Sequence, residues 1–153
     1  MATWSEFAAS APGLAVAGRR LFYQYGPGLG FLATVRADGG PRLHPVCPVI
    51  TGDGLYVFVV ASPKGGDLER DGRYALHALL PDEVEEEFAV SGRAHRENDP
   101  AVRERVAAAY HAPVPDDHVL YALDVDRVLH AAYRFRGDWP PVYTKWIASQ
   151  PER

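Results

Sequence analysis

The chain has 153 residues, of which 47% are hydrophobic and 24% are charged, and its formal net charge is −4 at pH 7. This length and composition predict one globular domain over residues 1–153, and the charge excludes bulk attraction to nucleic acid or to an anionic membrane. The single cysteine, Cys47, excludes an internal disulfide and a cysteine-based zinc site and fits a cytoplasmic protein, and no apolar run approaches the ~20 residues of a membrane span.

The N-terminal segment, residues 3–25, is expected to be helical. Residues Thr3 to Glu6 have the spacing of a capping box, which begins a helix near residue 4. Pro12 breaks this helix and begins a second one, in which apolar residues recur at helical spacing as far as Tyr25. The Gly-Pro-Gly sequence that follows predicts the end of the second helix.

The rest of the chain is predicted to be mainly β. Apolar runs at 30–36, 41–51 and 55–60 are separated by turns rich in Asp and Gly, which are typical of hairpins. Further strands are expected at 73–80, 84–96, 119–124, 128–135 and 142–147, with short helices near 62–71 and from residue 99. Together they predict a barrel-like sheet over residues 29–148, with helices outside it.

The turn after the third strand has the chemistry of an anion site. Val60 and Ala61 end the apolar run, Ser62 is a candidate helix N-cap, and Pro63 suits the first helical position. Lys64 lies in the first turn, where the helix already carries a partial positive charge and a cation is disfavoured unless an anion compensates. This pattern indicates a phosphate site, and the alternative is an exposed cap with a solvated lysine. The two glycines after the lysine are expected to relieve crowding.

The strand that begins at residue 41 is a second candidate. Prolines such as Pro45 cannot donate to a sheet ladder, so they place this strand at an edge or a bulge. Its free backbone could pair with a planar heterocycle, with Arg42 and His44 reaching the polar groups and Val46 on the same face. The alternative is an edge strand protected by prolines and a charge. The six histidines have no zinc spacing, so no metal site is predicted.

The order and spacing of these elements resemble the flavin-binding split barrels of the pyridoxamine 5'-phosphate oxidase-like superfamily. The resemblance rests on the helical opening at Trp4, the hairpin from Phe31 to Gly39, the strand from Pro41 to Val46, the turn Ser62 to Lys64 and the strand from Tyr121 to Val128. It implies a six-stranded antiparallel split β-barrel of Greek-key type. It also implies a homodimer with two flavin mononucleotide (FMN) sites at the subunit interface.

The resemblance also implies roles for the candidate residues. The strand from Arg42 to Val46, with Val60 and Ala61, would lie along the isoalloxazine ring, and Ser62, Pro63 and Lys64 would hold the phosphate. Trp146 is the candidate for an aromatic contact from the partner chain. The chain lacks the tryptophan- and arginine-rich C-terminal signature of the true vitamin B6 oxidase, so oxidation of pyridoxamine phosphate is not expected.

These observations predict a small FMN-binding oxidoreductase with a small-molecule substrate that the sequence does not define, and they assign no general acid or base. One alternative keeps the fold and changes the cofactor to a deazaflavin with a longer, anionic tail. The cations available to such a tail are Arg42, Lys64, Arg70 and Arg73. Another alternative is a non-catalytic barrel that binds flavin or haem, with His44 or His130 as the haem ligand.

Overall fold

A computed structural model describes residues 1–83 and 85–149. The helices are α1 (Trp4–Ser10), α2 (Pro12–Phe22), α3 (Pro63–Arg70) and α4 (Pro100–Ala109). The strands are β1 (Gly30–Val35), β2 (Pro41–Val46), β3 (Val49–Thr51), β4 (Gly54–Val59), β5 (Arg73–Ala78), β6 (Glu86–Arg96), β7 (Val119–Ala132) and β8 (Val142–Ile147). No helix in these ranges is both long enough and apolar enough to cross a membrane.

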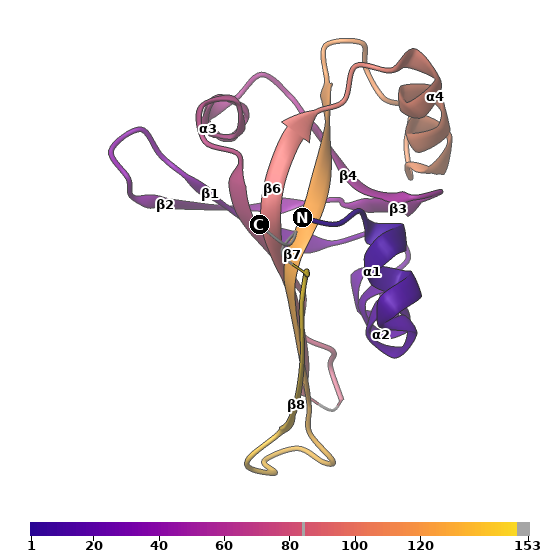
Figure 1. Cartoon of the computed structure of the whole chain (residues 1–153), viewed down its shortest axis with the longest axis vertical. Helices are drawn as coiled ribbons and strands as arrows, with labels where there is room; N and C mark the ends of the chain where they lie inside the picture. Colours follow the sequence, from indigo (N-terminus) through magenta and orange to yellow (C-terminus); the bar gives the residue numbers. More distant parts are fainter. Residues whose placement is uncertain (84, 150–153) are drawn as a thin grey trace.

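All of the strands join one curled antiparallel sheet in the order β2-β1-β5-β6-β7-β4-β3, and β8 pairs with β7. Figure 1 shows α1 and α2 side by side next to the sheet, α3 near the β1–β2 hairpin, and the β7–β8 hairpin projecting from the rest. The mainly β, split-barrel class is therefore confirmed.

Within the described ranges the sheet has eight strands, not the six that the resemblance implies. The run expected over 41–51 is divided into β2 and β3 by Cys47 and Pro48, and proline has no N–H for a ladder. Conversely, the run at 119–124 and most of the run at 128–135 form one long strand, β7, which ends at Ala132. The pairing of β7 with β6 shifts register between Ser91 and Gly92. The two backbones are so close here that a Cβ at Gly92 would lie 2.0 Å from the Asp124 carbonyl oxygen.

The inner face of the sheet carries the main core. On α1 and α2, Trp4, Phe7 and Phe22 are buried around Phe88 of β6, with edge-to-face ring contacts such as Phe22–Phe88 at 5.6 Å. Leu68 of α3 joins the same cluster. Three of the helices therefore cover the inner face, because each presents its apolar residues on one side.

The outer face is covered only in part. Helix α4 packs Val106 into a second cluster with Phe58 of β4 and Leu120 of β7. Further along the outer face, Phe31 of β1 and Leu43 of β2 stay exposed. These two apolar side chains are therefore not covered by any helix of the described chain.

Candidate functional site

Helix α3 begins directly after β4, as the sequence predicts. Ser62 is in an extended conformation and Pro63 takes the first helical position. The N–H of Gly66 donates to the Ser62 carbonyl at 3.2 Å, but the Ser62 side chain makes no capping hydrogen bond. The first-turn N–H groups of Lys64 and Gly65 therefore lack a side-chain cap. Such free N–H groups can donate hydrogen bonds to an anion.

The Ser62 hydroxyl is the second notable feature of this turn. Its Oγ is buried and has no hydrogen-bond partner among the described residues. An unsatisfied buried polar group costs about 1–3 kcal/mol, so this hydroxyl needs a hydrogen-bond partner that the described chain does not supply. The arrangement of an uncapped helix start, an unpaired hydroxyl and a lysine fits a phosphate group.

The glycines after Lys64 do not relieve crowding, and that expectation was wrong. A Cβ at Gly66 would meet nothing within 4 Å. A Cβ at Gly65 would lie 3.4 Å from Val59 Cγ1 and 3.9 Å from Ser62 Oγ, which are ordinary contacts. The packing of the chain itself therefore requires neither glycine.

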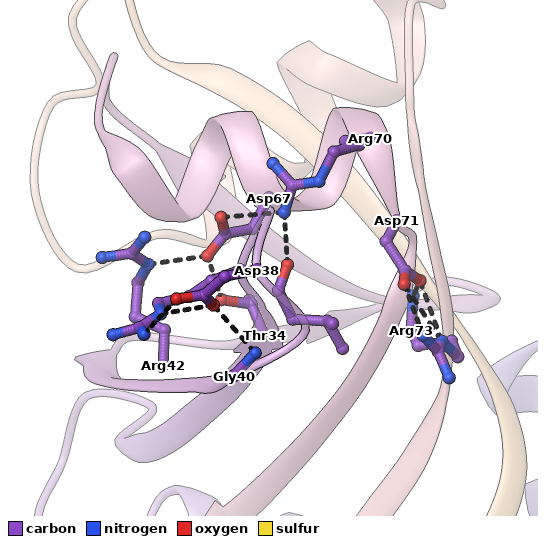
Figure 2. A network of polar contacts seen from close by, with 10 residues as sticks. Thr34, Asp38, Gly40, Arg42, Asp67, Arg70, Asp71 and Arg73 are labelled. Atoms are coloured by element: carbon purple, nitrogen blue, oxygen red, sulfur yellow. Dashed lines mark hydrogen bonds and ion pairs between the residues drawn. The ribbon is translucent and has the colours of Figure 1, made fainter.

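Asp67 is a buried acidic residue beside the candidate site that the sequence pattern did not indicate. It is only 2% exposed, and its carboxylate accepts hydrogen bonds from Thr34 Oγ1 at 2.7 Å, Arg42 Nε at 2.6 Å and Arg70 at 3.2 Å. Figure 2 shows these donors converging on the carboxylate from β1, β2 and α3. Burial alone would raise the pKa of Asp67, but the hydrogen bonds from Arg42, Thr34 and Arg70 outweigh it and lower the pKa to about 2.

Through Asp67, the structure brings Arg42 to α3. Thr34 and Arg42 lie directly opposite each other in the β1–β2 ladder, and both side chains reach the Asp67 carboxylate. Lys64 precedes Asp67 by three residues, so the two share a helix face about one turn, or ~5.4 Å, apart. Arg42 of β2 therefore contacts α3 about one helical turn after Lys64.

These two cations differ in how far they are already paired. Arg42 is engaged with Asp67 through Nε, and its side chain remains 27% exposed. Lys64 makes no ion pair in the described part of the chain. An open hollow of about 340 Å³ adjoins Arg42 and is also lined by Arg36 and Asp38. This hollow lies at the β1–β2 hairpin and offers room for a ligand beside Arg42.

The other residues of β2 follow the expected alternation. The strand is at the edge of the sheet and pairs only with β1 within the described chain, so the prediction of an edge strand is confirmed. His44 is half-buried on the same side as Arg42 and the buried Val46, whereas Pro45 is exposed on the other side. Because β2 pairs only with β1 in the described chain, one side of its backbone is free. At the end of β4, Val60 and Ala61 are both exposed.

Trp146 lies in a different part of the molecule. Its Nε1 donates to Ser10 Oγ at 2.7 Å, and its ring packs against Phe7 at 5.0 Å between centroids. Within its own chain it therefore connects β8 to α1. His130 is also engaged, because its Nε2 lies 2.8 Å from Glu86 Oε1.

Two further groups bear on the choice of ligand. Arg70 donates to Asp67 and to the Val35 carbonyl, and Arg73 pairs with Asp71 at 2.6 Å. No three His, Cys, Asp or Glu side chains in residues 1–83 and 85–149 are placed to hold a metal ion.

The curled antiparallel sheet, with α1, α2 and α3 on its inner face, defines the split-barrel class of small β proteins. The chain belongs to the pyridoxamine 5'-phosphate oxidase family, whose sequence model matches residues 20–131. A comparison with curated proteins gave no significant match.

Similar solved structures share the fold at low sequence identity. A haem-binding protein from Mycobacterium smegmatis is 19% identical with a TM-score of 0.65, and the match covers 86% of this chain and 57% of that protein. General stress protein 26 from Bacillus anthracis is 21% identical with a TM-score of 0.57, covering 79% and 91%. An F420 reductase is 23% identical with a TM-score of 0.55, covering 67% and 89%. Two of these three names refer to a cofactor, haem in one and F420 in the other.

Proposed function

We propose that this protein binds FMN and that it is a flavin-dependent oxidoreductase. The phosphate is proposed to lie between β2 and the first turn of α3, in a region that we call the groove. The observation that carries the proposal is the buried Ser62 hydroxyl, which has no partner in the described chain and lies at an uncapped helix start. Lys64 and Arg42 supply positive charge on either side.

The roles of the residues follow from their positions. The Ser62 hydroxyl and the N–H groups of Lys64 and Gly65 donate to phosphate oxygens, and Lys64 pairs with their charge. Pro63 has a backbone conformation that suits the first helical position, and its missing N–H group would have no partner within the helix in any case. The terminal nitrogens of Arg42 approach the phosphate from β2.

The ring of the flavin is proposed to lie along the free side of β2. Backbone groups near Pro45 and Val46, and at Val60 and Ala61, pair with its polar edge, and His44 lies beside it. When bound, the flavin supplies hydride or electron transfer, while the protein binds and orients it. The substrate remains a small molecule that these residues do not specify.

The charges around the groove favour one phosphate over the anionic tail of a deazaflavin. Of the cations available to such a tail, Arg70 and Arg73 are paired with Asp67 and Asp71, and Arg42 shares Asp67. Only Lys64 of this set is without an ion pair in the described chain. Because the carboxylates offset most of the positive charge, a single phosphate dianion is better matched than several further anions.

A second copy of the chain is proposed to cover the exposed outer face. Small residues, including Ala75 and Ala89, line the middle of this face and would allow two sheets to approach closely. Along β6, Glu87 and Arg93 lie on the same side at opposite ends, and Arg127 is near the basic end. A two-fold axis that reverses β6 places the acidic end of one copy over the basic end of the other.

The β7–β8 hairpin supplies an aromatic contact for the partner. Trp139 is 73% exposed, and Phe135 in the same loop is exposed as well. Exposed aromatic residues on a projecting hairpin are typical anchors of an interface. We therefore replace Trp146, which packs inside its own chain, with Trp139 as the proposed partner contact near the C-terminus.

The proposal is tested by titrating the purified protein with FMN and with riboflavin, which lacks the phosphate, and by recording the visible spectrum. We expect FMN to bind more tightly than riboflavin, and Lys64→Ala to weaken FMN binding about 10–100-fold with little effect on riboflavin. Arg105→Ala, which removes a cation paired with Asp53, is the control. Equal affinities for FMN and riboflavin, or a Soret band with added haem and no FMN binding, would contradict the proposal.

A further inference from the structure

Three side chains from different elements donate to Asp67, although Asp67 itself is too buried to contact a ligand. We infer that Asp67 is a positioning residue, which holds Arg42 so that its terminal nitrogens face the phosphate. This inference rests on the proposed FMN site. It adds Asp67, which would not contact the phosphate but would position Arg42, a residue that does.

The geometry supports this role at the Arg42 end. A guanidinium group is planar and rigid, so fixing one of its nitrogens restricts the direction of the other two. Asp67 Oδ2 accepts from Arg42 Nε at 2.6 Å, which is the nitrogen nearest the backbone and the one that leaves the outer edge free. That outer edge is the part that binds phosphate oxygens in pairs.

The carboxylate is itself held in place. Thr34 Oγ1 donates to the same oxygen, Oδ2, at 2.7 Å, and Thr34 is buried in the middle of β1. Arg70 donates to the other oxygen, Oδ1, at 3.2 Å and also to the Val35 carbonyl at 2.5 Å. Because both oxygens accept hydrogen bonds, from donors on β1, β2 and α3, the carboxylate cannot rotate without breaking one of these bonds.

The sign of the effect separates this role from simple electrostatics. A carboxylate close to a bound phosphate repels it, so its removal should strengthen FMN binding if charge alone mattered. If Asp67 instead positions Arg42, its removal should weaken FMN binding, because Arg42 then occupies many side-chain conformations that miss the phosphate.

The experiment compares the ratio of riboflavin Kd to FMN Kd, which isolates the contribution of the phosphate. We expect Asp67→Ala to lower this ratio about tenfold and Asp67→Asn, which keeps the size of the side chain, to lower it by a smaller factor. Arg42→Ala should lower the ratio at least as far as Asp67→Ala. The double variant Arg42→Ala with Asp67→Ala should be no lower than Arg42→Ala alone, because both changes remove one function.

Arg105→Ala is the control for Arg42→Ala, since it removes an arginine that pairs with Asp53 and not with Asp67. It should leave the ratio within about twofold of the wild type. A wild-type ratio near one overturns the proposed phosphate site itself. A high wild-type ratio that is unchanged or raised in both Asp67 variants overturns the role of Asp67 and leaves the proposed site standing.

Discussion

The substitution Ser62→Ala is expected to have opposite effects on stability and on cofactor binding. In the free protein the Ser62 hydroxyl is buried without a partner in the described chain, so removing it should stabilise the fold by about 1 kcal/mol or more. The usual loss for removing a serine N-cap does not apply, because this side chain makes no capping hydrogen bond. For a chain of this size, a gain of ~1 kcal/mol raises the melting temperature by roughly 2–4 °C.

The same substitution should weaken FMN binding, because it removes a donor to a charged phosphate. Hydrogen bonds to charged groups contribute about 1.5–3 kcal/mol, which corresponds to roughly 10–100-fold in Kd. Thermal unfolding of the flavin-free protein and a fluorescence titration with FMN measure the two effects. Ser10→Ala, which leaves the Trp146 N–H without its acceptor, is the control and should lower stability without changing the Kd. The reasoning is refuted if Ser62→Ala lowers the melting temperature or leaves FMN binding unchanged.

Three other predictions concern stability and assembly. Gly66→Ala should stabilise the free protein by about 0.5–1 kcal/mol in thermal melts, because alanine favours the helical conformation of α3 and its Cβ would meet nothing within 4 Å. A loss of stability would show that this space is filled. The folded-state pKa of Asp67, about 2, lies below its usual value of 3.8, so its contribution to stability is complete above about pH 4 and is lost as the pH falls toward 2. Denaturant titrations between pH 5 and pH 2 should therefore show a shallower loss for Asp67→Asn than for the wild type, and parallel curves would contradict this. Trp139→Ser should weaken the proposed dimer in analytical ultracentrifugation, whereas an unchanged dissociation constant would exclude Trp139 from the interface.

Local sequence signals predicted the parts of the site that depend on neighbouring residues. The start of α3 follows from a strand that ends at Ala61 and a proline that suits the first helical turn, and both are local effects. The edge position of β2 follows from Pro45, because a proline excludes a ladder on that side. The class of fold followed from the turns between the apolar runs.

The remaining features depend on tertiary contacts that no local pattern encodes. Asp67 is important because β1, β2 and α3 meet at its carboxylate, and in the sequence it appears only as an acid in a short polar helix. A possible signal was its position next to the buried Leu68, since an acid on the buried side of a helix needs partners. Trp146 could not be placed because its contacts with Ser10 and Phe7 join the two ends of the chain.

The central claim is that the first turn of α3 holds the phosphate of FMN. Its most direct test is an NMR titration that follows the backbone amide signals of Lys64 and Gly65 during addition of FMN and, separately, of riboflavin. Both amide signals should shift strongly with FMN and much less with riboflavin. FMN binding that leaves these two amide signals in place, or that shifts them equally with riboflavin, would contradict this claim.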